Sequence, residues 1–72
     1  MTKVPELSHQ RVVRALERAG FVLRRRGKHL SMYHADKNVV AIIPRHNPVK
    51  RSTLAHILKE IDMTVDEFRS LL

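Results

Sequence analysis

Apolar residues recur at three- and four-residue spacing through residues 12–19. That spacing places them on one stripe of a helix, the face that packs on a core. Ser8 stands in front of this run, where serine is a preferred N-cap, and Gly20 behind it is a natural C-terminal stop. The pattern predicts a first helix over about residues 9–19.

After this helix the side chains alternate between two faces, with a period of two residues. Residues 21–26 and residues 29–34 each alternate between two faces, with a break at Gly27 between the two runs. Period-two patterning is typical of β-strands, and a glycine break between two such runs is typical of a hairpin. Strict alternation would put Arg24 and Arg26 on the same face of the first strand.

A third strand is predicted at residues 39–43, the most apolar run, which follows turn residues at 36–38 and ends at Pro44. Three antiparallel strands that follow one another in the chain form a meander. The next segment, residues 44–51, is polar and basic and contains two prolines, which stiffen it.

Two further helices are predicted in the C-terminal part. Residues 54–61 repeat apolar positions at i, i+3, i+4 and i+7, and Ser52 or Thr53 opens this helix. Thr64 and Glu67 form a capping-box pattern, which predicts a short final helix. Together these elements indicate an α+β fold of order α-β-β-β-α, with a three-stranded antiparallel sheet, helices packed on one face of it, and a short C-terminal helix.

The chain has 72 residues, near the lower size limit of domains that fold alone, so we expect a single domain over residues 1–72. A core of this size excludes multidomain enzymes and leaves little room for a deep substrate cavity. The absence of cysteine excludes disulfide frameworks, thiolate nucleophiles and Cys-ligated zinc. The five histidines lack the spacing of zinc sites, so we expect no metal and no cofactor.

The charge of the chain is strongly positive and unevenly distributed. Fourteen Lys and Arg against seven Asp and Glu give a net charge of +7, and residues 11–51 hold eleven basic and only two acidic side chains. Such a basic segment points to a polyanionic partner, with nucleic acid as the first candidate. No apolar run has the length of a signal peptide or a membrane span, so we expect a cytoplasmic protein that does not enter the membrane.

The densest group of candidate functional residues surrounds the glycine turn. Arginines 24–26, Lys28 and His29 flank Gly27 within six positions. Lys and Arg attract phosphates, turn amides can face a phosphate, and a neutral imidazole accepts a proton near neutral pH. Because RNA supplies its own 2′-hydroxyl nucleophile, one histidine and several cations suffice to cleave it, and DNA should resist. The expected products are a 2′,3′-cyclic phosphate and a 5′-hydroxyl.

Two other functions fit the same residues. A non-catalytic module of the double-stranded-RNA-binding type explains the fold and the charge, and leaves His29 an ordinary strand residue. A DNA-contacting or partner-dependent subunit would use the basic surface for phosphates alone. Cleavage of RNA but not of DNA, lost when His29 is replaced, distinguishes a nuclease from both.

The order of the elements and several short motifs resemble the HicA toxin family over about residues 8–68. The motifs are Gly20-Phe21, Gly27-Lys28-His29, Pro44-Arg45-His46, and Thr53-Leu54 followed by Ile57-Leu58. The resemblance implies a small double-stranded-RNA-binding-like fold, metal-independent cleavage of mRNA by a histidine, and inhibition by a HicB antitoxin.

Carried over by position, the resemblance makes His29 the catalytic histidine and Gly27 the turn residue before it. His46 matches the family's histidine after the third strand. Two residues depart from the family pattern, because Lys28 stands where serine is usual and Ser52 stands where glycine is common. We expect Lys28 to strengthen phosphate binding and Ser52 to cap the second helix.

The candidate RNA-binding residues are the cationic and turn residues around His29 and in the basic loop: Arg24, Arg26, Gly27, Lys28, His46 and Lys50. The expected partners are mRNA and a HicB-type antitoxin. A basic surface around the active histidine would be matched by an acidic, apolar-edged antitoxin face that covers His29.

Overall fold

The computed structural model describes residues 3–72, and the first two residues of the predicted domain lie outside the described residues. Six elements follow one another along the chain: α1 (His9–Arg18), β1 (Val22–Arg26), β2 (His29–His34), β3 (Val39–Pro44), α2 (Arg51–Glu60) and α3 (Val65–Ser70). This confirms the predicted order of elements, including the short C-terminal helix.

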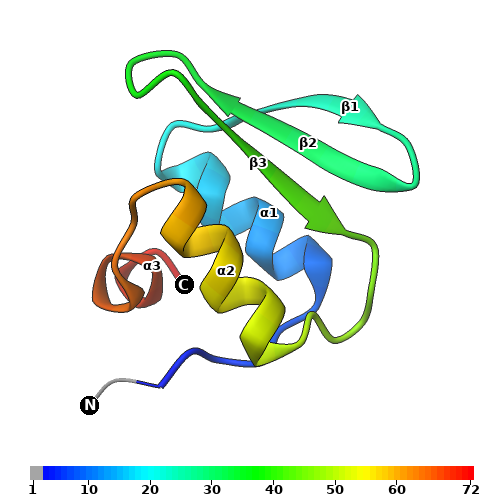
Figure 1. Ribbon diagram of the computed structural model, residues 1–72, viewed down its shortest axis with the longest axis vertical. Helices are drawn as coiled ribbons and strands as arrows, with labels where there is room; N and C mark the ends of the chain where they lie inside the picture. Colours follow the sequence, from blue (N-terminus) through cyan, green and yellow to red (C-terminus); the bar gives the residue numbers. More distant parts are fainter. Residues whose placement is uncertain (1–2) are drawn as a thin grey trace.

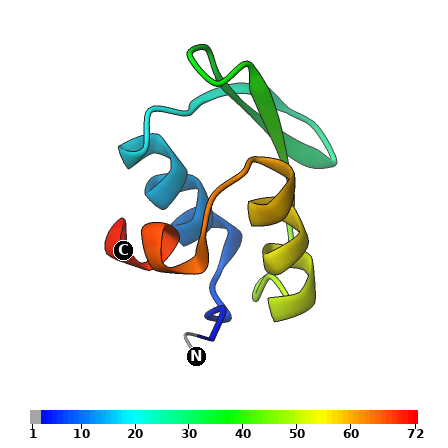
Figure 2. The ribbon, with the colours of Figure 1, turned by 60° about the vertical axis from the view of Figure 1, so that its left-hand side comes forward.

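The elements form two layers (Figure 1). The three strands make an antiparallel sheet in the order β1-β2-β3, so that β1 and β3 are its edges. In Figure 2 the helices of the described chain all lie on the same side of this sheet. The prediction that the helices pack on one face is therefore confirmed. None of the helices within residues 3–72 has the length and apolar character needed to cross a membrane.

The core lies between the sheet and the helices. Alternation along β2 and β3 sends Met32 and Ile43 inward, where both are fully buried. The helical stripes meet them with side chains that are also fully buried, namely Val12, Ala15 and Leu16 of α1, Leu54 and Leu58 of α2, and Phe68 of α3. Burial of each of these side chains other than Ala15 contributes roughly 1.5–3 kcal/mol, which is how a chain this short folds without disulfides.

The ends of two helices are capped as the sequence predicts. The Ser8 hydroxyl accepts a hydrogen bond from the Arg11 amide at 3.3 Å and closes the start of α1. The Thr64 hydroxyl accepts a hydrogen bond from the Glu67 amide at 3.1 Å, and the Glu67 carboxylate accepts one from the Thr64 amide. The second pair is a complete capping box at the start of α3.

The start of α2 differs from the prediction. The helix begins at Arg51 with Lys50 as its N-cap residue, and no side chain caps it. The prediction that Ser52 caps this helix is wrong. The Val49 amide donates to the Leu7 carbonyl oxygen at 2.6 Å, which fixes the chain as extended up to Lys50. The helix therefore begins before Ser52, which lies in its first turn.

Strand β1 contains an irregularity. Leu23 pairs with Met32 and Arg25 pairs with Ser31, so the register shifts across Arg24, which is left as an extra residue. An extra residue of this kind is a β-bulge, and it reverses the alternation of side chains beyond it.

The bulge separates two arginines that strict alternation would have placed together. The Arg24 guanidinium lies over the Tyr33 ring, 4.9 Å from its centroid, on the outer face of the sheet. Arg26 pairs with Leu30 and therefore shares the helix side of the sheet with it. The prediction that Arg24 and Arg26 lie on one face is wrong for this reason.

Candidate active site

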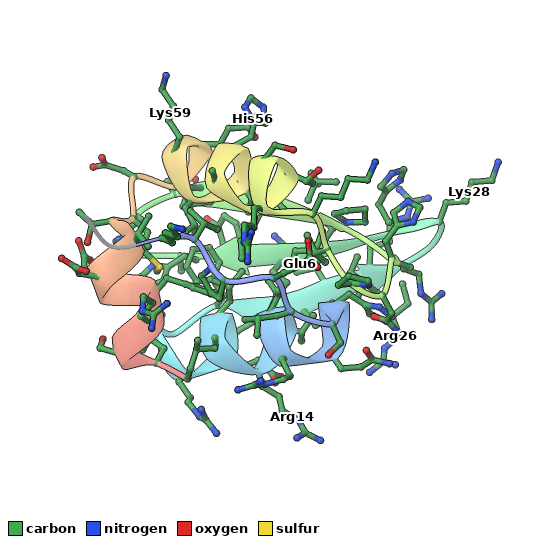
Figure 3. The ribbon with its side chains drawn as sticks, turned by 90° about the horizontal axis from the view of Figure 1, so that it is seen from below. Glu6, Arg14, Arg26, Lys28, His56 and Lys59 are labelled. Atoms are coloured by element: carbon green, nitrogen blue, oxygen red, sulfur yellow. The ribbon has the colours of Figure 1, made fainter. Side chains whose placement is uncertain are left out.

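Gly27 and Lys28 form the tip of the hairpin between β1 and β2, and His29 begins β2 directly behind it. The Gly27 amide donates to the His29 carbonyl oxygen at 3.2 Å and closes the tip. All three residues are exposed. Figure 3 shows Lys28 extending away from the end of the molecule, with Arg26 at the same end.

The His29 side chain belongs to the face of the sheet that the helices leave uncovered. It alternates with Leu30, which points into the core, and it pairs with Pro44 of β3. Paired residues of antiparallel strands share a face, so His29 and Pro44 are neighbours there. A macromolecule can therefore reach the imidazole without passing the helices.

The loop after β3 returns to the hairpin tip. Arg45 Nη1 donates a hydrogen bond to the Gly27 carbonyl oxygen at 3.2 Å, which ties the loop to the turn. Arg45 is not among the predicted site residues. Its only signal in the sequence is its position between two motif residues, Pro44 and His46.

His46 and Lys50 lie together in this loop rather than at the tip. Both line a hollow of about 270 Å³ that also involves Pro48 and Thr53. Among the hydrogen bonds of residues 3–72, none joins either side chain to the hairpin tip. The predicted residues therefore fall into two groups. The tip group is Arg24, Arg26, Gly27, Lys28 and His29 of the hairpin, and the loop group is His46 and Lys50. The hydrogen bond of Arg45 to Gly27 links the loop to the tip.

The loop group is held by the segment that leads into α1. Asn47 Oδ1 accepts hydrogen bonds from the His9 amide at 3.0 Å and from His9 Nδ1 at 2.8 Å. Leu7 and Val49 form a short antiparallel bridge beside them. These contacts, made across about forty residues of chain, fix the position of the basic loop relative to α1.

Arg26 faces a second hollow, on the helix side of the hairpin. This hollow of about 330 Å³ is also lined by Arg14 of α1, Arg45 of the loop, and the apolar Leu23 and Leu30. Positive side chains therefore flank both faces of the hairpin, with Arg24 on the outer face and Arg26 on the helix face.

Two other histidines, His34 and His56, lie away from the hairpin tip. His34 lies at the opposite end of β2, where its Nε2 donates to the Ala19 carbonyl oxygen at 3.2 Å. His56 is exposed on α2 and contacts Glu60 at 2.5 Å. In the described part of the chain, no three His, Asp or Glu side chains are grouped so that they could hold a metal ion.

Comparison with known protein families gives one match. The model of a family described as the HicA toxin of bacterial toxin-antitoxin systems matches residues 10–63, three quarters of the chain. The matched range includes the hairpin tip, His29 and the basic loop. No curated protein matches the chain.

Proposed function

The chain belongs to the HicA toxin family and is the toxin of a toxin-antitoxin system, and from this premise we propose that it is a metal-independent endoribonuclease that cleaves mRNA with His29 as the general acid/base. The observation that carries the proposal is the exposed His29 imidazole directly behind the cationic hairpin tip. The alternating strand holds this imidazole on an open face, where a strand of RNA can lie against it.

The chemistry requires little beyond these groups. His29 takes the proton of a 2′-hydroxyl, and the resulting oxygen attacks the adjacent phosphorus. The bond from phosphorus to the 5′-oxygen breaks, and that oxygen takes up the proton held by the His29 imidazolium, which leaves a 2′,3′-cyclic phosphate and a 5′-hydroxyl. Lys28 and the neighbouring arginines stabilise the negative charge that develops on the phosphate.

We assign RNA binding to the residues that supply positive charge, polar groups or bare backbone around this site: Arg24, Arg26, Gly27, Lys28, His46 and Lys50. The cationic side chains on the two faces of the hairpin, and the loop that Arg45 ties to its tip, support this assignment. The partners in this proposal are mRNA and a HicB-type antitoxin, and the reaction takes place in the cytoplasm.

The test is cleavage by the His29→Ala variant in the presence of a chelator, with an RNA and its DNA counterpart as substrates. We expect the wild-type protein to cleave only the RNA and His29→Ala to be slower by about 10²- to 10⁴-fold, the usual contribution of a general acid/base. RNA affinity and the free energy of unfolding should change little, because His29 is exposed. His56→Ala, an exposed histidine on α2, is the matched control and should cleave like the wild type.

End-group analysis of the products completes the test. Cyclic phosphate and 5′-hydroxyl ends support the proposed step. If the wild type and His29→Ala both bind RNA and neither cleaves it, the protein is a non-catalytic double-stranded-RNA-binding-like module. Cleavage that survives in His29→Ala would place the chemistry on another residue.

A further inference from the structure

The hollow of about 270 Å³ in the basic loop has a lining that suits a flat ring better than a phosphate. We call it the loop hollow. Its lining consists of one imidazole, one ammonium group, one hydroxyl and three apolar side chains: His46, Lys50, Thr53, Pro44, Pro48 and Val49. The hollow on the helix side of the hairpin is lined by three arginines, which are typical phosphate ligands. Aromatic and apolar side chains, by contrast, are the groups between which proteins hold an unpaired base.

Contacts within the described chain hold the loop hollow in shape. Val49 is fully buried, and its amide donates to the Leu7 carbonyl oxygen at 2.6 Å. Asn47, in the middle of the loop, accepts two hydrogen bonds from His9. The hollow is therefore formed before a ligand arrives, which lowers the cost of ordering it on binding.

Two polar side chains of the loop hollow are available to a ligand. Thr53 is half-buried, and among the hydrogen bonds of residues 3–72 none engages its hydroxyl. The exposed His46 imidazole has no partner among them either. A hydroxyl can donate to or accept from the edge of a base, and a histidine ring is one of the groups on which unpaired bases stack.

Pro44 joins the loop hollow to the proposed catalytic site. It lines the hollow and is also the cross-strand partner of His29. Paired residues lie about 5 Å apart and His46 is two residues farther along the chain, so the Cα atoms of His29 and His46 are at most about 13 Å apart. Figure 1 shows the loop leaving β3 at the end of the sheet that carries the turn between β1 and β2. A nucleotide whose phosphate lies at His29 can therefore turn its base into the loop hollow.

The volume of the loop hollow limits the ligand to one small group. Sites for small molecules usually measure about 300–1,000 Å³, and the loop hollow falls just below this range. A single planar base meets this limit, whereas several stacked bases or a folded peptide segment do not. Lys50, an exposed member of the lining, can pair with the phosphate of the same nucleotide.

We propose that the loop hollow binds one unpaired base of the RNA, in a nucleotide next to the cleaved bond, and so determines at which base the toxin cuts. The His46 ring and the prolines pack on the faces of this base, and the Thr53 hydroxyl bonds to its edge. The RNA must be single-stranded there, because a paired base cannot enter the hollow. The position of the base beside the cut rests on the proposed function, whereas binding of the base does not require cleavage.

The test is the base preference of cleavage, read by sequencing the ends that the protein leaves in an RNA pool of random sequence. We expect the wild type to prefer one base or class of base at one position beside the cut. Thr53→Val removes the hydroxyl and keeps the shape of the side chain, so this preference should fall about three- to tenfold. Ser52→Ala, next to Thr53 on α2 but outside the lining of the loop hollow, is the matched control and should keep the wild-type preference.

Variants of His46 separate base stacking from proton transfer. His46→Ala removes the ring and should raise KM about fivefold or more, as the loss of one stacked base does. His46→Phe keeps a ring that carries no proton, and it should bring KM back to within about threefold of the wild type. A loss of kcat in both variants would make His46 a proton-transfer group and overturn its assignment to the base.

An RNA of the preferred sequence that lacks the base at that one position gives a second measurement. Removal of the base should lower kcat/KM of the wild type about fivefold or more. The same removal should lower kcat/KM of His46→Ala less than about threefold, because this variant has already lost the contact. Equal losses in the two proteins overturn the proposal.

The same base preference in the wild type, Thr53→Val and His46→Ala also overturns the proposal, as does cleavage by the wild type without any base preference. If the wild type binds RNA without cleaving it, the pool is sorted by binding instead of by cleavage. A base preference in binding that Thr53→Val and His46→Ala abolish would then support the loop hollow as a base site, while the proposed function fails.

Discussion

The fold requires one of the two glycines of the chain and does not require the other. Gly20 has a φ of +100°, and a Cβ built there would lie 3.1 Å from the Nε2 atom of His34, so the fold requires glycine. Gly27 has a backbone conformation open to other residues, and a Cβ there would meet only the His29 carbonyl oxygen, at 3.9 Å. The fold does not need glycine at the hairpin tip. The proposed function supplies another reason for it, the close approach of a phosphate to bare backbone.

Replacing each glycine by alanine separates these two roles. For Gly27→Ala we expect a free energy of unfolding within about 0.5 kcal/mol of the wild type. We expect an RNA affinity about three- to tenfold lower, because the added methyl group holds a phosphate away from the turn. For Gly20→Ala we expect a loss of about 1–3 kcal/mol from backbone strain. Chemical denaturation and fluorescence anisotropy measure the two effects. RNA affinity unchanged in Gly27→Ala would show that the turn backbone does not contact RNA.

At the scale of the elements, the sequence predicts the helices and strands whose apolar residues recur at a regular spacing. The helical stripes and the alternation of β2 and β3 span several turns or several pairs, so their type and order are evident. The bulge in β1 is not evident, because the residues after Leu23 are three arginines. No apolar residue follows in the strand to show which positions face the core. Nothing in the sequence therefore indicates that Arg24 is the extra residue.

The same limit applies to the candidate site. Gly27, Lys28 and His29 are adjacent in the chain, so their grouping can be predicted from the sequence. The hydrogen bond from Arg45 to Gly27 depends on how β3 pairs with β2, and this register follows from packing of the whole sheet. Contacts between distant segments are therefore the part of the site that needed the structure.

The uncapped start of α2 predicts a conflict between stability and RNA binding. Lys50 occupies the N-cap position with extended backbone angles, φ −61° and ψ 147°, that suit a serine cap. Lys50→Ser should therefore raise the free energy of unfolding by about 0.5–1 kcal/mol. The same change should lower RNA affinity about three- to fivefold through loss of a phosphate contact.

Thermal unfolding and RNA titration of Lys50→Ser are the measurements. Ser52→Ala, in the first turn of the same helix, is the control and should change neither quantity, because Ser52 does not cap the helix. A less stable Lys50→Ser protein would mean that the lysine stem packs on the helix. Unchanged RNA affinity would remove Lys50 from the RNA-binding residues.

At the scale of the whole molecule, one group of positive side chains lies at the end that carries the hairpin tip, and a second group, Arg11, Arg14 and Arg18, lies along α1. Figure 3 shows Lys28 and Arg26 at that end, whereas Lys59 projects from α2 elsewhere. The acidic residues of the C-terminal part, Glu60 and Asp62 among them, follow Lys59 directly in the chain. Long-range attraction should therefore bring RNA to the tip first.

Salt dependence tests this distribution of charge. For single-stranded RNA, the logarithm of the binding constant falls with the logarithm of salt concentration by about 0.7 for each phosphate contact. Lys28→Ala should therefore reduce the slope by about 0.7, and Lys59→Ala should leave it unchanged. Anisotropy titrations between low and high salt give both slopes. Equal reductions in the two variants would mean that RNA binds without a preferred face.

The exposed hairpin tip has a consequence for how such toxins diverge. The side chain of residue 28 lies outside the core, and its backbone is not in the left-handed region. Exchanging that residue costs folding almost nothing, so under the proposed function selection at this position acts through contact with RNA. The lysine found here, where the resemblance leads one to expect serine, is such an exchange. When one exposed position contributes little to the stability of the fold, single substitutions at that position can change which RNA targets the toxin prefers.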